Sequence, residues 1–406
     1  FLIVPVMPNI LPFTLLGVAI YRGLLDNIRA GSPGLLIHTS KAQLSSILYY
    51  ITGHGFGHTV RSVQVIRALK RSLPELSIYV RSTAPEWLVQ HTLFPVQYSR
   101  QSLDAGIVQT NSLKMDLGKT LRACQALHAE APALIQQERD FIRYHKIQLI
   151  VGDIPALCFE IAAQTSRRSV AISNFTWSWI YRAYLNDHPH FLPIIEKMDG
   201  FYRKTTLALT LPCAGGMEVF PLREPIPWIS RMSALSKDEA RERFNLPRAG
   251  TMVLLSFGGL GLSGLSWSRL KQSKDFFFVA TGASETVDGN VFILPDAQHH
   301  YEDLVRAADV IVTKPGYGIV ADVLAHRVRI LYTDRGDFAE YPRLVQVLTE
   351  CATAEYVPQK ELLSGDFLSY LTSLLEKKPN WPDVRLDGAQ IAAEKVLAIL
   401  NGHSAT

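Results

Sequence analysis

The sequence predicts an α/β protein whose chain folds into two similar halves, each built on a parallel β-sheet. Three observations lead to this prediction. Short apolar runs rich in β-branched residues alternate with amphipathic helical stretches over residues 46–173. A second alternation of the same kind covers residues 250–333, and the proline-rich segment 212–236 lies between the two. Strands alternating with helices are typical of doubly wound parallel sheets with helices on both faces.

The first half contains four strand candidates and three helical stretches. Each strand candidate is short and apolar, which is typical of a strand covered on both faces. The expected strands are 46–51, 76–82, 147–153 and 168–173, and the expected helices lie near 59–72, 117–144 and 155–165.

The second half repeats this pattern. Its strand candidates are four to eight residues long and apolar throughout, and one helix separates the last two. The expected strands are 250–257, 275–281, 290–294, 309–313 and 329–333, with a helix at 320–326. Residues 387–401 have the pattern of one amphipathic helix.

The segment 212–236 is expected to join the halves without regular structure. Its prolines and paired glycines interrupt both helices and strands. They are Pro212, Gly215, Gly216, Pro221, Pro225 and Pro227. The domain prediction is an N-terminal extension (1–44), a first domain (45–220), a linker (221–236), a second domain (237–380), and a C-terminal helix and tail (381–406).

Composition excludes several classes of protein. Apolar residues make up 48% of the chain and charged residues 19%, which is enough to build buried cores and argues against a disordered polymer. The net charge of +4 is too small to predict nucleic-acid binding, but it is compatible with a small anionic ligand. The four cysteines are far apart in sequence, and we expect free thiols rather than a metal or redox site.

The N-terminal 21 residues carry no charge, and this length could cross a membrane. Pro5, Pro8 and Pro12 would break a helix there. We therefore expect a poorly ordered extension, with a membrane anchor as the alternative. No later segment is a candidate span.

The loop TGHGFGH, residues 52–58, follows the first strand and opens a helix. A helix start has unpaired N–H groups and attracts anions. The glycines do not fit the GxGxxG dinucleotide pattern, because His58 stands where the third glycine is required. The second strand ends in VRSTAP, without an acidic residue for a ribose. A nicotinamide enzyme is therefore disfavoured.

Two further glycine loops follow strands in the second half. They are SFGGLGLSG at 256–264 and TKPGYGIVAD at 313–322. Two anion-binding loops in one half suit a diphosphate with a sugar on either side. The alternative is that their glycines only make tight turns. Lys314, beside the second loop's glycines, favours the ligand interpretation there, although it could also be a solvated loop residue.

TGHGFGH and KPGYGIVADVLAHRVRILYTDRGDFAEYP together resemble the two-domain GT-B glycosyltransferases. The chain most resembles bacterial proteins related to the N-terminal, glycosyltransferase-like half of plant L-arabinokinases. It resembles more distantly the family 28 enzyme that adds N-acetylglucosamine to the peptidoglycan lipid precursor. The similarity covers roughly residues 46–375. It implies two Rossmann-like domains facing across a cleft, an N-terminal acceptor domain, and a C-terminal domain for a nucleotide-sugar donor, with UDP as the default nucleotide.

The resemblance also assigns residues. It places His58 at the glycine-loop histidine, which acts as general base or oxyanion contact. It places Asp322 where the family usually has a ribose-binding Glu. The predicted donor-binding residues are Gly55, Gly57, Gly258, Gly259, Gly261, Lys314, Gly316, Gly318, Asp322, Asp337 and Glu340.

The residues themselves support acid–base chemistry at the first loop. An acceptor hydroxyl is a poor nucleophile at neutral pH, and a neutral histidine at a helix start can take its proton. We predict His58 in this role, with Asp153 at the end of a neighbouring strand as its partner. Asp153 could instead cap the helix that follows it. His54 is the second candidate histidine, placed in the cleft.

The remaining site predictions concern the leaving group and the acceptor. No DxD motif occurs, so we expect no metal and no cofactor; loop amides, the helix start at 316–318 and Lys314 would stabilise the diphosphate. The aromatic stretch 173–191 is expected either to face the acceptor or to pack in the core. Asn174, Trp177 and Tyr181 are its cleft candidates.

The sequence therefore predicts a metal-independent glycosyltransferase that takes a nucleotide-diphosphate sugar, with UDP the default, and an unidentified hydroxyl acceptor. The alternatives are a nucleotide-sugar-binding module without transfer activity and a nucleotide-sugar 2-epimerase on the same fold. We expect a cytoplasmic location, with contact at the inner face of a membrane left open, and no nucleic-acid partner.

Overall fold

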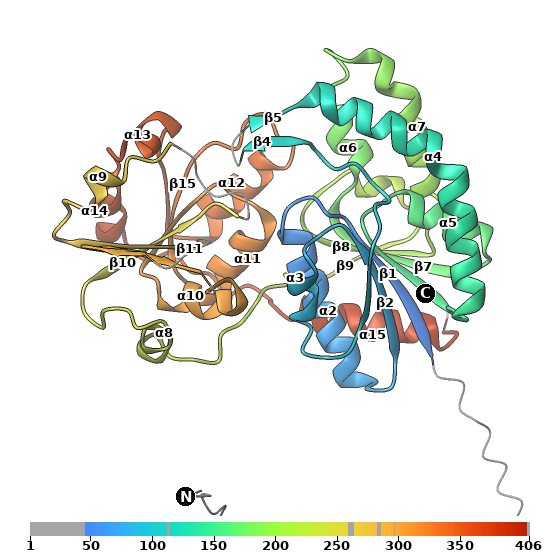
Figure 1. The fold of residues 1–406 in the computed structure, drawn as a ribbon, viewed down its shortest axis with the longest axis horizontal. Coiled ribbons are helices and arrows are strands. Elements are labelled where there is room, and N and C mark those ends of the chain that lie inside the picture. The colour runs from blue at the N-terminus through green and yellow to red at the C-terminus, as the bar shows by residue number, and fades with distance from the viewer. Residues whose placement is uncertain (1–44, 112–113, 259–263, 282–285, 296, 404–406) are drawn as a thin grey trace, which may run out of the picture. The chain divides into compact units, whose positions relative to one another are not determined.

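The computed structural model describes residues 45–111, 114–258, 264–281, 286–295 and 297–403. Within them lie two seven-stranded sheets, each covered by helices (Figure 1). The first sheet has the order β3-β2-β1-β6-β7-β8-β9 and the second the order β12-β13-β11-β10-β14-β15-β16. Neighbouring strands pair in parallel except β12, which is antiparallel to β13. The predicted α/β class with two doubly wound sheets is confirmed.

The first half contains the elements expected for residues 46–173, together with further strands and helices that the sequence did not indicate. Its strands are β1 (Ser46–Ile51), β2 (Ser77–Ser82), β3 (Gln97–Arg100), β6 (Leu149–Asp153), β7 (Arg168–Phe175), β8 (Leu207–Gly215) and β9 (Arg223–Pro225), with a separate hairpin of β4 (Gln109–Asn111) and β5 (Lys114–Met115). Its helices are α2 (Gly57–Ser72), α3 (Glu86–Gln90), α4 (Leu117–Tyr144), α5 (Leu157–Gln164), α6 (Trp177–Arg182) and α7 (Leu192–Tyr202), with 3₁₀ turns at Pro189–Phe191 and Met217–Val219.

The second half has the five strands predicted for it, each within two residues of its expected bounds. Its strands are β10 (Thr251–Ser256), β11 (Phe276–Thr281), β12 (Thr286–Asp288), β13 (Val291–Leu294), β14 (Val310–Thr313), β15 (Arg329–Tyr332) and β16 (Ala354–Tyr356). Its helices are α8 (Lys237–Arg243), α9 (Trp267–Leu270), α10 (Tyr301–Ala307), α11 (Tyr317–His326), α12 (Tyr341–Cys351), α13 (Gln359–Ser364) and α14 (Leu368–Glu376), with a 3₁₀ turn at Ala297–His300. The last helix is α15 (Gly388–Leu400).

Strand β1 shows why such strands are apolar throughout. Ile47 and Tyr49 belong to one buried cluster, whereas Leu48 and Tyr50 belong to another. Successive side chains of a strand point to opposite faces, so a strand with helices on both faces buries every residue. Each half consequently holds its sheet rigidly between two apolar layers, and the loops at the strand ends start from fixed positions.

The segment 212–236 was expected to lack strands, and this expectation is wrong. Strand β8 continues through Pro212, and β9 pairs with β8 at the edge of the first sheet. The β7–β8 register shifts between Ser173 and Phe175, and Pro212 lies opposite this irregularity, where a ladder hydrogen bond is not needed. Pro225 ends the edge strand, a position that also tolerates proline.

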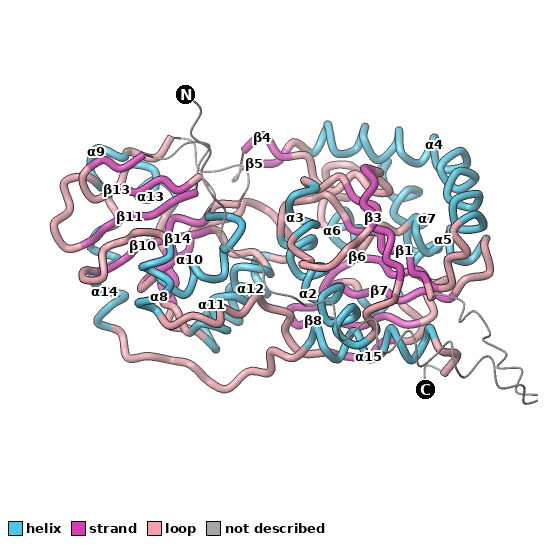
Figure 2. Tube along the Cα trace, turned by 60° about the horizontal axis from the view of Figure 1, so that its bottom comes forward, coloured by secondary structure: helices cyan, strands magenta, loops and turns pink. Residues whose placement is uncertain are grey.

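Helix α15 returns to the first half after the chain has completed the second. It packs against α2, β6 and β7 (Figures 1 and 2). The Gly388 N–H donates to the Trp228 carbonyl at 3.1 Å, and a Cβ at Gly388 would lie 2.2 Å from the Pro227 carbonyl oxygen. The helix itself was predicted, but its packing against the first half was not.

The N-terminal extension 1–44 lies outside the described residues. In the part of the chain that the structure describes, none of the helices combines the length and the apolar character that crossing a membrane requires. The four cysteines are free thiols, as predicted.

Candidate functional site

A cavity of about 590 Å³ is lined by loops at the carboxyl ends of strands from both sheets. This is where ligands bind in open α/β folds, and the volume lies in the range of small-molecule sites. Helix α2 begins on one side of it and α11 on the other. The two helix starts meet closely, since a Cβ at Gly318 would lie 3.5 Å from the Cα of Gly57.

Many of the residues predicted from the sequence line this cavity. They are His54, Gly55, Gly57, His58, Gly258, Lys314, Gly316, Gly318 and Glu340. Gly259 and Gly261 lie outside the described residues. Asp153, Asn174, Trp177, Tyr181, Asp322 and Asp337 are not among the lining residues.

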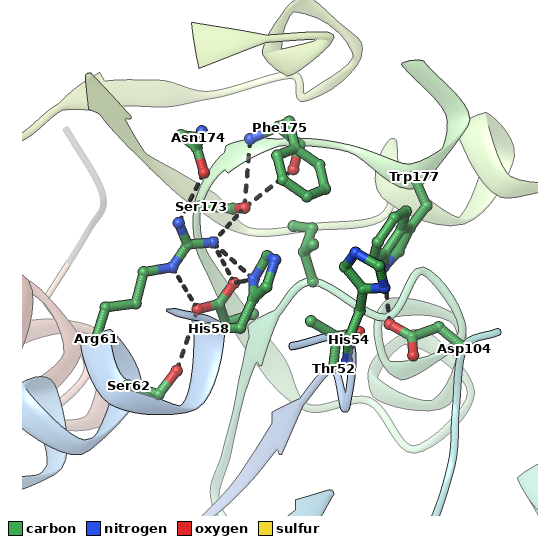
Figure 3. Close-up of polar contacts among 12 residues, drawn as sticks. Thr52, His54, His58, Arg61, Ser62, Asp104, Ser173, Asn174, Phe175 and Trp177 are labelled. Atoms are coloured by element: carbon green, nitrogen blue, oxygen red, sulfur yellow. Dashed lines mark hydrogen bonds and ion pairs between the residues drawn. The ribbon is translucent and has the colours of Figure 1, made fainter. Parts of the chain in front are cut away.

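His58 and Asp153 form a buried pair on the first-half wall. Figure 3 shows His58 beside the Arg61 side chain, which also contacts this pair. His58 Nδ1 lies 2.8 Å from Asp153 Oδ1. His58 comes from the first turn of α2 and Asp153 from the end of β6, and Ile51 of β1 pairs in register with Asp153. The proximity predicted from the two strand ends is thus present.

Arg61, one turn along α2, joins this pair. Its Nε lies 2.7 Å from Asp153 Oδ2, and its Nη2 lies 2.6 Å from Asp153 Oδ1. Ser62 Oγ adds a hydrogen bond to Asp153 Oδ2 at 3.1 Å. Asp153 is therefore a fully bonded carboxylate with no exposed surface.

The bonding pattern fixes the tautomer of His58. Arg61 Nη2 also lies 2.9 Å from His58 Nδ1, but its two hydrogens are used by Asp153 Oδ1 and Ser173 Oγ. The hydrogen between His58 and Asp153 must then belong to Nδ1, because two lone pairs would otherwise face each other. The neutral ring keeps Nε2 as a proton acceptor, and it lines the cavity.

Burial, together with the charge of Arg61, keeps His58 neutral. Burial, and next the Arg61 guanidinium, lower the pKa of His58 below its ordinary value, although Asp153 opposes them. Burial by itself would raise the pKa of Asp153, but the charge of Arg61 and the hydrogen bonds of Arg61 and His58 hold it at about 2. The pair at neutral pH is a carboxylate beside an uncharged imidazole.

His54 has the opposite arrangement. The Ile107 N–H donates to His54 Nδ1 at 3.2 Å, so the proton of the neutral ring is on Nε2. Burial, followed by the charge of Arg335, lowers the pKa of His54 to about 3. The ring stacks on Phe338 and meets Trp177 edge-on. His54 is therefore a hydrogen-bond donor at Nε2, whereas His58 is an acceptor there.

The second-half wall carries cations and a helix start. Lys314 precedes α11, and burial and then the charge of Arg335 lower the pKa of Lys314 to about 7. Arg335 Nη1 pairs with Glu340 Oε2 at 2.7 Å, and both residues line the cavity. The N-terminal amides of α11 add partial positive charge. Such a wall can hold an anion.

Asn174 connects the two walls although it does not line the cavity. It accepts a hydrogen bond from Arg61 Nη1 at 2.7 Å and donates one from Nδ2 to Glu340 Oε1 at 2.7 Å. A continuous chain of buried polar contacts therefore runs from His58 through Asp153, Arg61 and Asn174 to Glu340. Its role differs from the acceptor contact predicted for Asn174.

Trp177 and Tyr181 are core residues, so their predicted place in the cleft is wrong. They are 0% and 2% exposed and stack on each other. Trp177 Nε1 donates to Asp104 Oδ2 at 2.8 Å, and Tyr181 donates to the Gly106 carbonyl at 2.6 Å. The Trp177 ring contacts the rings of His54 and His58, and Tyr181 stacks on Trp177. The packing alternative for the stretch 173–191 is therefore the correct one for these two residues.

Asp322 and Asp337 lie away from the cavity lining. The Asp322 carboxylate is fully buried and binds the Arg231 backbone N–H at 3.0 Å as well as the Arg231 guanidinium. Asp337 is exposed, and its carbonyl accepts from Tyr184 at 2.9 Å. The sugar and ribose contacts expected of them stay predictions, and Arg231 is the residue of this group that lines the cavity.

Sequence reasoning missed Arg61, Arg231 and Arg335. Arg61 was detectable in principle, because it lies one helical turn after His58 and therefore on the same face of α2. Arg231 and Arg335 gave no such signal, since one lies in the proline-rich segment and the other in a loop after β15.

Comparisons with known proteins agree with this architecture. Residues 45–192 match the family model described as glycosyl transferase family 1. The Arabidopsis thaliana L-arabinokinase is 27% identical over 353 residues, which cover 85% of this chain and 33% of that protein. The chain thus spans about a third of that relative's length.

Solved structures share the fold at low identity. A Polygonum tinctorium UDP-glucosyltransferase that glucosylates indoxyl has a TM-score of 0.55 at 12% identity, covering 88% of this chain and 99% of that one. The chain therefore has the GT-B fold of these glycosyltransferases.

Two further solved structures share the GT-B fold with this chain. Phytolacca americana UGT2, solved with UDP-2fluoro-glucose and pterostilbene, has a TM-score of 0.55 at 11% identity, covering 88% of this chain and 94% of that one. A putative UDP-N-acetylglucosamine 2-epimerase from Listeria monocytogenes has a TM-score of 0.52 at 10% identity, covering 87% and 95%. The GT-B fold therefore includes both transferases and an epimerase-like protein among its neighbours.

Proposed function

We propose that this protein is a glycosyltransferase that moves a sugar from a nucleotide-diphosphate donor, UDP-linked by default, to a hydroxyl acceptor. The observation that carries the proposal is the pairing of a proton acceptor with an anion-binding wall across one cavity. His58 Nε2 is available on the first-half side, and Lys314 and the start of α11 are on the second-half side. UDP-2fluoro-glucose and pterostilbene occupy a neighbour of the same fold, which supports the choice of substrates.

In the proposed reaction, the acceptor hydroxyl attacks the anomeric carbon as its proton passes to His58 Nε2. The bond between the anomeric carbon and the diphosphate oxygen breaks, and its electron pair leaves with the nucleotide diphosphate. Asp153 keeps the imidazole in the tautomer that can accept the proton. Such a base contributes roughly 10² to 10⁴ to the rate.

Lys314 and Arg335, together with the N-terminal amides of α11, are the groups proposed to stabilise the departing diphosphate. They supply positive charge from the chain itself, so we propose that no metal ion is required. His54, a donor at Nε2, would hydrogen-bond an oxygen of the bound substrates rather than remove a proton. Transfer with the metal chelator EDTA present should equal transfer with added Mg²⁺.

The second candidate is a nucleotide-sugar 2-epimerase, which the Listeria monocytogenes neighbour brings into consideration. An epimerase would return a UDP sugar with changed stereochemistry and would not need an acceptor. The third is a nucleotide-sugar-binding module that binds the donor without turnover. The site of the second candidate would need acid–base groups around the sugar C2, whereas a transferase needs one base facing an acceptor.

The deciding experiment is a panel of UDP sugars assayed for UDP release, with cell extract as acceptor source, and for conversion to an isomeric UDP sugar. The wild type is compared with His58→Ala and with His190→Ala, an exposed histidine away from the cavity. If the protein is a transferase, it should release UDP from one of the donors. His58→Ala should abolish this release, and His190→Ala should leave it unchanged. An isomeric UDP sugar without UDP release would indicate the epimerase. Binding without either product, unchanged in His58→Ala, would indicate the binding module.

A further inference from the structure

Arg61 makes an unusually complete set of contacts for a residue in the first turns of a helix. It is 2% exposed, and its guanidinium bonds Asp153 through Nε and Nη2, Asn174 through Nη1, and Ser173 through Nη2 at 3.0 Å. The guanidinium also lies over the Tyr317 ring, 5.0 Å from its centre. A buried arginine with this many fixed partners has one position.

That position changes what Asp153 can do for His58. A carboxylate that faces only an imidazole stabilises the protonated ring as an ion pair. Here the Asp153 carboxylate is already paired through both oxygens with Arg61. If His58 gained a proton, it would become a second cation 2.9 Å from Arg61 Nη2, with a single carboxylate between the two.

We propose that Arg61 is the positioning residue of this site: it holds the Asp153 carboxylate, so that His58 is oriented by Asp153 yet stays uncharged and presents Nε2 as an acceptor. The catalytic meaning of this inference rests on the transferase function proposed above. The charge state of His58 does not, because it is a property of the protein without substrate.

The other groups that face His58 do not reverse this balance. The charges that face His58 are Arg61 on its own helix, Asp153 from β6 and Glu340 from the segment before α12. The titratable group that faces it from the glycine loop is His54, which is uncharged at neutral pH. Glu340 favours a charged ring, but its two oxygens are bonded to Asn174 and Arg335. Burial disfavours the charged ring as well, and it acts in the same direction as Arg61.

The position of Arg61 is also linked to the second half. Asn174 accepts from Arg61 and donates to Glu340, which pairs with Arg335 on the anion-binding wall. The proton acceptor and the wall proposed for the diphosphate are therefore connected through Arg61. A residue that only filled space at this place would need neither the bidentate contact with Asp153 nor the hydrogen bond to Asn174.

The test is a pH titration of His58 in the full chain without substrate, by NMR of protein labelled with ¹³C at the histidine Cε1. The His58 signal is assigned by its absence in His58→Gln. The wild type is compared with Arg61→Gln, which removes the charge, and with Arg67→Gln, the same substitution on the same helix. Arg67 Nε bonds the His91 carbonyl at 2.7 Å and does not contact the pair, so it is the matched control.

We expect wild-type His58 to titrate below its ordinary midpoint of about 6.5. Arg61→Gln should raise the proton affinity of His58 by about tenfold or more, equivalent to a shift of one pH unit. Arg67→Gln should leave it unchanged. A wild-type midpoint at or above about 6.5, or an unchanged midpoint in Arg61→Gln, would overturn the proposal.

Arg61→Gln leaves a buried carboxylate with fewer partners, and the variant could fail to fold. Arg61→Lys is therefore measured as well, since it keeps the charge but cannot reproduce the two parallel hydrogen bonds. A raised midpoint in Arg61→Lys supports the positioning role, and an unchanged one contradicts it. If neither variant folds, the wild-type titration decides: a midpoint below about 6.5 supports the proposal, and a midpoint at or above about 6.5 overturns it.

The kinetic consequence provides a separate readout. If the transferase proposal holds, the acid limb of the pH–rate profile moves to higher pH in Arg61→Gln, because a base with greater proton affinity is lost at higher pH. If no sugar transfer is found, the transferase proposal fails while the NMR titration still decides the role of Arg61. The two failures are thus distinguishable.

Discussion

The wall that the first half contributes to the cavity and the wall that the second half contributes hold their charges in different ways. On the first, His58, Arg61 and Asp153 are less than 10% exposed and are bonded to one another within a single network. On the second, Lys314 and Arg335 are partly exposed and stand beside a glycine-containing helix start. On the first wall the charged groups Arg61 and Asp153 are bonded to each other, whereas Lys314 and Arg335 of the second wall line the cavity where a ligand would bind.

This difference indicates a division of labour between proton transfer and anion binding. A base must keep one tautomer and one orientation, which requires buried and satisfied partners. An anion site needs accessible positive charge and backbone N–H groups, and it gains from being open until the anion binds. Variants on the two walls should therefore affect different measurements.

The largest effect should come from the first wall. We expect His58→Gln to slow sugar transfer by roughly 10² to 10⁴, because the proton acceptor is lost. The affinity for UDP should stay unchanged, since UDP would bind the other wall. His54→Gln, which removes a donor at Nε2 rather than a base, should slow transfer less. UDP release and UDP calorimetry measure the two quantities, and equal losses in both variants would contradict the assignment of the base.

The next effect tests the second wall. Lys314→Met should weaken UDP binding by about 10- to 100-fold, the value of one charge-assisted hydrogen bond. The pKa of Lys314 is about 7 in the empty site, so the amine loses its proton above that pH. Binding of a diphosphate favours the charged amine, and wild-type affinity should therefore fall as the pH rises from about 7 to about 9.

Lys314→Met should remove most of this pH dependence, which calorimetry at several pH values can measure. The His58 titration should not move in the same variant, because Lys314 is not among the groups that shift His58. An unchanged UDP affinity in Lys314→Met would remove the residue from the donor site.

A third variant breaks the connection between the walls. Asn174→Leu leaves Arg61 Nη1 and Glu340 Oε1 without the partner they have now. We expect a loss of about 1–3 kcal/mol in the free energy of unfolding, the usual cost of buried polar groups left unpaired. Asn186→Leu on the surface is the control and should stay within about 0.5 kcal/mol of the wild type. Urea denaturation would show whether the two variants differ; equal stabilities would mean that the connection is energetically unimportant.

The smallest effect concerns stability at acid pH. The pKa of His54 is lowered to about 3 in the folded protein, so the unfolded chain binds the proton first as the pH falls below about 6.5. The uncharged His54 ring therefore stabilises the folded state fully above pH 6.5, and this stabilisation is lost progressively as the pH falls toward 3. His54→Gln should show a shallower decline between pH 6.5 and 5 in thermal denaturation. If the stability of His54→Gln falls as steeply as that of the wild type, groups other than His54 cause the loss of stability at acid pH.

The strands and the glycine loops could be predicted because their signals are local. Strand β1 is a run of apolar residues and α2 follows a loop of glycines, so both appear within a few positions of each other in the sequence. His58 and Asp153 were also predictable as neighbours, since the carboxyl ends of parallel strands lie on one edge of a sheet. The sequence did not predict which aromatic residues face the cavity and which face the core, and Trp177 is a core residue.

The sequence by itself determined the two α/β halves, the positions of their glycine loops, and the histidine that faces the cavity. Only the tertiary structure decided that Arg61 binds Asp153, which lies 92 residues further along the chain. It also decided that Asn174 binds Glu340, from which it is separated by 166 positions in the sequence. A sequence pattern predicts local secondary structure and burial over a few residues. A buried ion pair between distant residues depends instead on which strands become neighbours in the fold. The elements of the site are therefore local, and the charge state of its histidine is a property of the assembled fold.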